Sequence, residues 1–285
     1  MKSEYQPDAC ATPHPQAGSA GVIHVEGRTI HLRSPDSPVC RWIGQKEAFR
    51  LLTAAWLRRD PTDPAMSPVL VGPPGCGKTT LACAVAAHYD QPIFLMNCSA
   101  DMRPEDLLVI PVLASNGEIR YQASGLVSAA LTGGICVLDE ANRMNEKAWA
   151  SLASLLDDRR YVDSVIAGVK LHAAAEFRLV ATMNNDSSTF SIPAYIESRL
   201  RPVIRVERPG MDELAAIVQQ NVPGVSTDFR NRVLARLDEL VETGALATYS
   251  IRDAIQICRF GSKNPVGFTP LDAIQATLGL APENT

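Results

Sequence analysis

A glycine-rich turn between an apolar run and a helix-forming run constrains this chain more than any other feature. The turn fits the pattern G-x-x-x-x-G-K-[ST], whose fixed positions are occupied by Gly72, Gly77, Lys78 and Thr79. The apolar run before it is typical of a buried strand, and residues 81–87 after it contain neither glycine nor proline. A chance glycine turn would not also lie between a strand and a helix. The stretch therefore predicts a loop that binds a nucleoside triphosphate.

The residue types in this loop have physical reasons. Backbone N–H groups can surround a phosphate only where no Cβ intervenes, and the start of a helix adds its dipole and unpaired donors. Lys78 supplies a charge for the β- and γ-phosphates, and the Thr79 hydroxyl is a candidate Mg²⁺ ligand. The residues expected around the phosphates are Gly72, Pro73, Pro74, Gly75, Cys76, Gly77, Lys78, Thr79 and Thr80.

Length and composition limit the classes of protein that fit. The chain has 285 residues, enough for one large or two modest domains, with 46% hydrophobic and 20% charged residues. No apolar run reaches the roughly 18 residues of a membrane helix, and the first residues lack the layout of a signal peptide. The seven cysteines form no C-x-x-C pair and are interpreted as reduced, buried thiols. We therefore expect a cytoplasmic protein without membrane association.

A formal net charge of −4 argues against a broad basic surface for nucleic acid. It is compatible with a local basic stripe in the pore of a ring. Nucleic acid is therefore an unfavoured partner.

Residues 1–38 form a segment of their own, rich in Pro, Ser and Gly. We expect the first twenty residues to be flexible. Residues 22–32 partly alternate around a glycine, which is typical of a small β-hairpin. An amphipathic helix is expected next, in a stretch that opens at Trp42 and runs to about Arg59.

Apolar runs alternate with helical patterns across residues 39–208. This alternation predicts a parallel sheet with helices on both faces. The expected strands lie at 68–72, 92–98, 135–139, 177–184 and 202–207. The expected helices lie at 78–89, around 124–132, 145–158 and 193–199.

Two stretches interrupt that alternation, at about 108–122 and 160–172. The first contains Asn116-Gly117, a strong hairpin signal. Neither stretch is needed to complete a nucleotide-binding core, so both are candidate insertions. After Pro209 the strand signals stop, and residues 209–285 are expected to form a separate helical subdomain, with helices at 211–221, 228–243, 250–260 and 269–279.

Hydrolysis needs a metal site and a group that aims water, and Ile135-Cys136-Val137-Leu138-Asp139-Glu140 supplies both. Asp139, at the end of an expected strand, can hold Mg²⁺, and Glu140 can polarise the attacking water. Asn184 ends the next expected strand of the core, and ligands occupy the carboxyl ends of parallel strands. Asn185 is adjacent, so the register could shift by one residue. An ordinary turn is the alternative for these polar positions.

With these residues in place, the chain resembles the AAA+ ATPases, and specifically their MoxR-type branch. The resemblance covers roughly residues 40–280. It rests on the loop at 72–79, Leu-Asp-Glu-Ala-Asn-Arg at 138–143, Leu-Leu-Asp-Asp-Arg-Arg at 155–160, Ala-Thr-Met-Asn-Asn at 181–185 and Ser-Arg-Leu at 198–200. It implies an α/β fold: a P-loop AAA+ three-layer core with a parallel five-stranded sheet and two β-hairpin inserts, followed by a small all-helical lid subdomain. It also implies ATP and Mg²⁺ as cofactors.

The resemblance also implies roles for single residues. Asn184 matches the sensor-1 position, and Arg252 matches the sensor-2 arginine of the helical lid. Ile43 and Gly44, followed by Gln45, match the segment that lines the adenine pocket.

Arg199 matches an arginine finger, which reaches the ATP of a neighbouring subunit. Where family members commonly have Phe after that arginine, this chain has Leu200 and then Arg201, which leaves Arg201 as an alternative finger. The expected catalytic residues are therefore Glu140, Lys78, Asn184, Arg199, Arg201 and Arg252, with Thr79 and Asp139 as metal ligands.

The function implied by this resemblance is a Mg-dependent ATPase that assembles into a ring, expected to be hexameric, and remodels or activates a partner protein. The partners implied are a protein with a von Willebrand factor A domain and a protein client, and both inserts would face that side of the ring. The alternatives are a nucleic-acid motor or clamp-loader-like switch, a chelatase-type motor subunit, and a slow, partner-bound regulatory switch.

Overall fold

The computed structural model describes residues 21–38, 41–60, 63–185, 192–263 and 268–280. The expected flexibility of residues 1–20 therefore concerns residues outside the described part. The core is a five-stranded sheet in the order β11-β3-β10-β7-β4, and every neighbouring pair is parallel. Its strands are β3 (Val69–Gly72), β4 (Ile93–Asn97), β7 (Ile135–Asp139), β10 (Arg178–Asn184) and β11 (Val203–Arg205). The predicted parallel sheet is confirmed.

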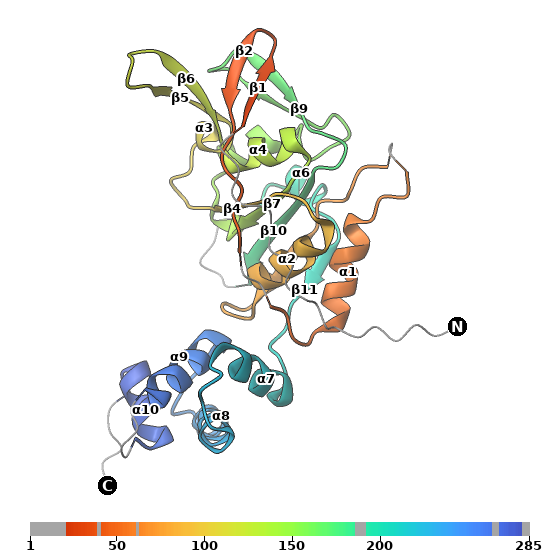
Figure 1. The fold of residues 1–285 in the computed structure, drawn as a ribbon. Coiled ribbons are helices and arrows are strands. Elements are labelled where there is room, and N and C mark those ends of the chain that lie inside the picture. The colour runs from red at the N-terminus through yellow and green to blue at the C-terminus, as the bar shows by residue number, and fades with distance from the viewer. Residues whose placement is uncertain (1–20, 39–40, 61–62, 186–191, 264–267, 281–285) are drawn as a thin grey trace.

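Side chains alternate across the sheet, so each strand contributes to two apolar layers. In β3, Leu70 joins a cluster with α1 (Lys46–Trp56) and α2 (Lys78–Ala86), whereas Val69 joins a cluster on the opposite face. That opposite face is covered by α3 (Pro104–Leu107), α4 (Gly125–Thr132), α5 (Glu146–Leu152) and α6 (Ala194–Glu197). Two apolar layers around one sheet give the three-layer core (Figure 1).

The hairpins form a second sheet at one end of the molecule (Figure 1). The N-terminal hairpin pairs β1 (Val22–Val25) with β2 (Arg28–His31), and the first insert pairs β5 (Val109–Leu113) with β6 (Ile119–Ala123). The two hairpins join through a parallel pairing of β2 with β6, in which Ile30 lies opposite Tyr121. The sequence predicted each hairpin but not their union, because pairing between distant segments leaves no local signal. The second insert, β8 (Tyr161–Ser164) and β9 (Val169–His172), forms its own two-stranded sheet.

The C-terminal region is helical, with α7 (Met211–Asn221), α8 (Thr227–Glu242), α9 (Ile251–Ser262) and α10 (Pro270–Leu278) packed around a separate apolar cluster. Ser250 and Thr269 form capping boxes at the starts of α9 and α10, and Pro270 occupies the first turn of α10. Figure 1 shows these helices set apart from the sheet, joined to it by the chain that follows β11.

Two helices end earlier than their patterns predict. Helix α1 ends at Trp56, where the next residue is extended and Met66 N–H bonds back to the carbonyl of Ala55 at 3.0 Å. Helix α5 ends at Leu152 instead of 158, because the chain turns there to bury Leu155 and Leu156 under the sheet. Tertiary packing overrides the helical pattern at both ends.

The cysteines of the described residues agree with the expectation from composition. These five cysteines, Cys76, Cys83, Cys98, Cys136 and Cys258, are free and buried. Within the same ranges, no helix combines the length and the apolar character that crossing a membrane requires.

Candidate functional site

The phosphate loop has the backbone that its sequence requires. Gly75 and Gly77 have φ angles of 70° and 96°, in the left-handed region where a side chain is strained. A Cβ at Gly72 would lie 2.0 Å from the carbonyl oxygen of Val206, so strand β3 and the chain after β11 approach each other through this glycine. The loop leads directly into α2 at Lys78, and the helix N-terminus faces the loop.

Lys78 is 7% exposed and bonds to three oxygens at the ends of two neighbouring strands. Its Nζ donates to the carbonyls of Gly72 and Pro73 at 3.0 and 2.9 Å, and to Asn184 Oδ1 at 2.8 Å. This hydrogen bond from Lys78 identifies Asn184, and not Asn185, as the amide that faces the loop. Lys78 and Asn184 come from segments more than 100 residues apart and meet because β10 lies beside β3.

Asp139 is the last residue of β7, and one oxygen of its carboxylate accepts hydrogen bonds from two hydroxyl groups. Thr79 Oγ1 donates to Asp139 Oδ1 at 2.6 Å, and Thr182 Oγ1 donates to the same atom at 2.5 Å. A carboxylate beside the hydroxyl of the phosphate loop is the donor set that Mg²⁺ prefers with a nucleoside triphosphate. The residues therefore fit a magnesium–nucleotide complex, with Thr79 and Asp139 as the protein groups that would hold the metal.

Glu140 follows directly and has a φ of 54°, which is unusual for a residue with a side chain. Its backbone N–H donates to Thr182 Oγ1 at 3.1 Å, and its carboxylate lies 2.6 Å from Arg143 Nε in an ion pair. Both side chains of that pair are about half exposed, at 44% for Glu140 and 52% for Arg143. The carboxylate is therefore accessible at the edge of the sheet where the phosphate loop lies.

Two contacts tie the helical region to the nucleotide side of the core. A Cβ at Gly75 would lie 2.6 Å from Cβ of Ser250, the N-cap of α9, and Arg252 is an exposed residue in the first turn of that helix. A Cβ at Gly44 would lie 2.3 Å from the carboxyl carbon of Glu213 in α7, and Glu213 Oε1 accepts from Gln45 N–H at 3.2 Å. The expected adenine segment and the expected sensor-2 helix are thus both held at the boundary between core and lid.

Arg199 and Arg201 do not join the cluster around the phosphate loop. Arg199 donates to the carbonyl of Tyr195 and to Asp157 Oδ2, the latter at 3.4 Å. Arg201 pairs with Glu197 at 3.8 Å. None of these three partners belongs to the phosphate loop or is Asp139 or Glu140, as expected for arginines that do not serve the site of their own subunit.

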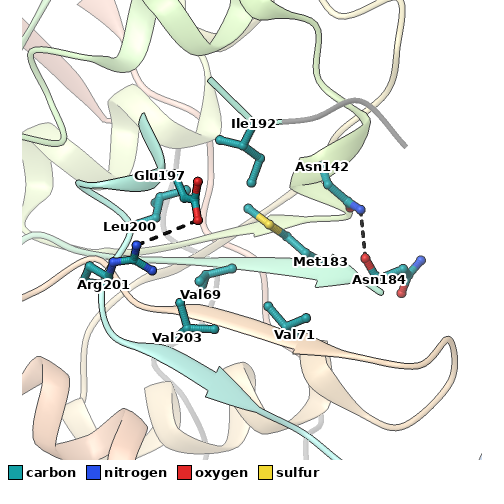
Figure 2. A pocket seen from close by; sticks show the side chains of 10 residues that line it. All are labelled: Val69, Val71, Asn142, Met183, Asn184, Ile192, Glu197, Leu200, Arg201 and Val203. Carbon is teal, nitrogen blue, oxygen red and sulfur yellow. Dashed lines mark hydrogen bonds and ion pairs between the residues drawn. The ribbon is translucent and has the colours of Figure 1, made fainter. Parts of the chain in front are cut away.

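Arg201 lines an apolar cavity of about 370 Å³ beside β3, β10 and β11. Figure 2 shows the Glu197–Arg201 pair at one side of it and Asn142 and Asn184 at the other. Asn142 is 5% exposed, and its Nδ2 donates to the backbone carbonyl of Asn184 at 3.0 Å. Asn142 thereby fixes the end of β10, a role that its position in the 138–143 motif did not indicate.

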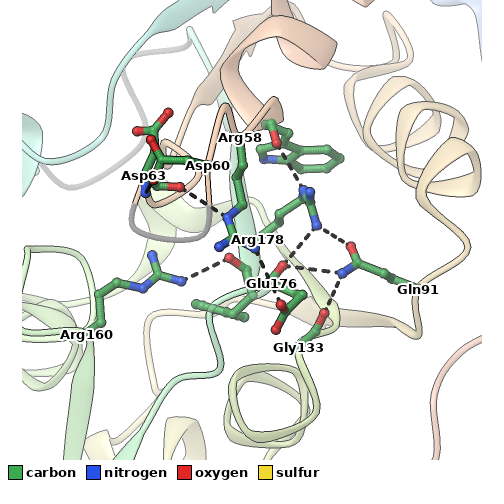
Figure 3. Close-up of polar contacts among 10 residues, drawn as sticks. Arg58, Asp60, Asp63, Gln91, Gly133, Arg160, Glu176 and Arg178 are labelled. Atoms are coloured by element: carbon green, nitrogen blue, oxygen red, sulfur yellow. Dashed lines mark hydrogen bonds and ion pairs between the residues drawn. The ribbon is translucent and has the colours of Figure 1, made fainter.

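A buried polar cluster lies at the other end of the sheet (Figure 3). Arg178 opens β10 and is 8% exposed; its Nε donates to the carbonyl of Trp56 at 3.2 Å and its Nη1 to Gln91 Oε1 at 2.5 Å. Its guanidinium lies 4.2 Å from the centre of the Tyr89 ring. Burial lowers the pKa of Arg178 from its usual value. This cluster anchors the strand whose opposite end carries Asn184.

Sequence reasoning missed Thr182, Asn142 and Glu213 as parts of the site. Thr182 lies two residues before Asn184, at the parity that places both side chains on the same face of β10.

Two further residues pack at the phosphate loop. The sequence placed Trp42 only before a helix, but its ring lies 3.2 Å from the Cβ position of Gly77. Cys76 in the loop is 2% exposed, and burial raises the pKa of its thiol.

Comparison with known proteins finds similarity over part of the chain. A family model described as "AAA domain (dynein-related subfamily)" matches residues 67–200. The chain is 36% identical over 118 residues to "Protein NorQ" of Paracoccus denitrificans, which covers 41% of this chain and 43% of NorQ. It is 30% identical over 151 residues to "Denitrification regulatory protein NirQ" of Stutzerimonas stutzeri, which covers 53% of this chain and 52% of NirQ. The chain spans about half the length of these relatives.

A solved structure supports the fold alone. The structure of NtrX from Brucella abortus in complex with ADP is similar with a TM-score of 0.54 at 18% identity, covering 84% of this chain and 55% of NtrX.

Proposed function

We propose that this chain is an AAA+ ATPase of the MoxR type, which hydrolyses ATP in a ring and uses that hydrolysis to remodel or activate a partner protein. The matched AAA domain and the similarity to NorQ and NirQ support this proposal. One observation carries the hydrolytic part of the proposal. Lys78 and Thr79 at the start of α2, Asp139 at the end of β7 and Asn184 at the end of β10 converge at one edge of the sheet through bonds of 2.6 and 2.8 Å.

The residues divide the chemical work. Lys78 and the backbone of the loop hold the phosphates, and Thr79 and Asp139 hold Mg²⁺. When bound, that metal neutralises charge on the phosphates. Glu140 accepts a proton from the attacking water, and Asn184 orients the group at the γ-phosphate end. Arg143 competes for the carboxylate of Glu140, so Glu140 acts as a base only after this ion pair opens.

The ring part of the proposal rests on the two arginines. Arg199 pairs with Asp157 and Arg201 with Glu197, and neither partner belongs to the phosphate loop. A subunit that receives an arginine from a neighbour gains a factor of about 10³–10⁵ in rate. We therefore expect an isolated subunit to be a poor ATPase and the assembled ring, expected to be hexameric, to be the active form.

We propose that the partner on which this chain acts is a protein. NirQ carries the description of a denitrification regulatory protein, and a regulatory role on another protein or complex is the part that we extend to this chain. A partner with a von Willebrand factor A domain and a protein client are proposed from the MoxR-type resemblance. The formal charge of −4 does not favour the alternative of a nucleic-acid motor.

Light scattering and an ATPase assay together test the proposal. The Glu140→Gln variant should bind ATP, hydrolyse it slowly and assemble into particles of about six subunits with ATP. Lys78→Ala, which removes the phosphate contact, should bind ATP weakly and hydrolyse little of it. Hydrolysis by Glu140→Gln at the wild-type rate would refute the assignment of the base. A monomer in all conditions would refute the ring.

A further inference from the structure

One buried hydroxyl joins the two carboxylate residues of the site. Thr182 lies in the middle strand of the sheet, β10, and is 0% exposed. Its Oγ1 donates to Asp139 Oδ1 at 2.5 Å and accepts from the backbone N–H of Glu140 at 3.1 Å. A single side-chain atom therefore contacts both the expected metal ligand and the expected base.

The direction of these bonds is fixed. A backbone N–H can only donate, so Thr182 Oγ1 must accept from Glu140, and its one proton is available for the carboxylate of Asp139. Both bonds are made at once by a side chain that is itself fully buried. The hydroxyl thus holds the chain at the point where β7 ends and Glu140 takes up its left-handed conformation, with φ at 54°. Such a conformation persists only where surrounding contacts determine it.

The second hydroxyl on Asp139 cannot replace this one. Thr79 also donates to Asp139 Oδ1, at 2.6 Å, but Thr79 is itself an expected Mg²⁺ ligand. A lone pair of Thr79 Oγ1 can bind the metal while its proton still donates to Asp139. Thr182 differs from Thr79 because its hydroxyl also accepts from the backbone N–H of Glu140. Groups that orient a metal ligand in this way commonly change metal affinity or activity by about 10–100-fold when removed.

We propose that Thr182 is a positioning residue for catalysis, which sets the orientation of the Asp139 carboxylate toward Mg²⁺ and the backbone from which Glu140 reaches water. This inference rests on the proposed function of Asp139 and Glu140. It predicts a defect in metal-dependent steps, whereas a purely structural role of Thr182 predicts a defect in stability alone.

The test compares Thr182→Val, which keeps the shape and removes the hydroxyl, with Thr182→Ser, which keeps the hydroxyl. The full-length proteins are assayed for kcat and KM with ATP. Their affinity for a fluorescent ADP is measured in EDTA and along a Mg²⁺ titration. For Thr182→Val we expect kcat to fall by about 10-fold or more, and the midpoint of the Mg²⁺ titration to rise by a similar factor. Affinity in EDTA should change by less than about twofold, because the hydrogen bonds of the Thr182 hydroxyl go to Asp139 and Glu140 and not to the phosphate loop.

Thr182→Ser should restore most of kcat and of the Mg²⁺ response. A matched control is Thr132→Val, which removes a hydroxyl bonded to the carbonyl of Ser128 within α4, at 2.7 Å, and should leave both quantities as in wild type. If Thr182→Val does not fold, Thr182→Ala takes its place, since it removes the hydroxyl without placing a new methyl group.

Two results would overturn the proposal: a Thr182→Val or Thr182→Ala protein with wild-type kcat and Mg²⁺ midpoint, or a Thr182→Ser protein as impaired as Thr182→Val. The Glu140→Gln protein separates this failure from failure of the proposed function. If Glu140→Gln is inactive while Thr182→Val is normal, only the role of Thr182 is wrong. If Glu140→Gln is fully active, the assignment on which it rests is wrong.

Discussion

Arg199 is paired with Asp157, with Nη2 of the arginine 3.4 Å from Oδ2 of the aspartate. The same carboxylate also forms an ion pair with Arg159, whose Nη2 lies 2.8 Å from Oδ2. The guanidinium of Arg159 in turn lies 5.7 Å from the centre of the Tyr161 ring, at the start of β8. Asp157 therefore stands between the expected arginine finger and the hairpin β8–β9.

We expect Asp157→Asn to lower kcat about three- to fivefold with little change in KM, because the neutral amide holds Arg199 less firmly in a partly exposed pair. The hydrogen bond from Arg159 is the main cause that lowers the pKa of Asp157 to about 2. A lowered pKa means that the charged form persists until the pH falls toward that value. The ratio of wild-type to variant rates should therefore be the same at pH 6 and pH 8. Steady-state ATPase assays measure this ratio, with Asp158→Asn as the control. A ratio that changes between pH 6 and pH 8 would contradict the assignment of a charged Asp157 as the partner of Arg199.

Mixed assemblies distinguish the two candidate fingers. Arg199→Ala should leave nucleotide binding intact and abolish most hydrolysis, because the charge is needed at the neighbour's phosphate. Adding subunits that carry Lys78→Ala and an intact Arg199 should restore hydrolysis in the mixture. The same experiment with Arg201→Ala is the comparison. If the added Lys78→Ala subunits restore hydrolysis only to Arg201→Ala, then Arg201 is the finger. If they restore hydrolysis to neither variant, the finger acts within its own subunit.

Gly44→Ala should weaken nucleotide binding about tenfold. Gly44 has a φ of 78°, and the added Cβ would meet the carboxylate of Glu213, displacing α7 from the core. Gly27→Ala is a matched control: its φ is 76°, and the described residues leave the space within 4 Å of its Cβ empty. Titration of fluorescent ADP measures the affinity. Equal affinities for the two variants would show that the Glu213 contact does not matter to the nucleotide.

Arg178→Met should destabilise the fold by about 2–4 kcal/mol, because it leaves the buried carbonyl of Trp56 and the side chain of Gln91 without their donor. Arg205→Met, on an exposed position of β11, should change stability by less than about 0.5 kcal/mol. Urea unfolding measures both. A fall in stability that is equal for the two variants would mean that loss of charge, and not loss of these bonds, is the cause.

Local patterns predicted the strands of the core and the phosphate loop because each depends on residues that are neighbours in sequence. The end of β3, the glycines of the loop and the start of α2 form one continuous stretch, and its physical requirements can be read there. Asp139 and Asn184 could be placed for a second reason: parallel strands bring their carboxyl ends to one edge.

Contacts between distant segments could not be predicted in this way. Threonine is common in strands, so its residue type does not mark Thr182. The one sequence signal is that Thr182 lies two residues before Asn184, which places both side chains on the same face of the strand. The pairing of Glu213 with Gln45 depends on how the lid packs against the core, for which the sequence carries no period or motif. The early end of α5 at Leu152 has the same origin, since burial of Leu155 and Leu156 outweighs local helix preference.

The parallel pairing of β2 with β6 makes the first insert dependent on residues that precede the nucleotide-binding core. Transplanting residues 108–123 alone into a related protein would leave β6 without β2, with unsatisfied backbone groups at a new edge. A chimaera meant to exchange this insert between related proteins should therefore carry residues 21–32 together with the insert. The two segments form one exchangeable unit, although some 75 residues of chain lie between them.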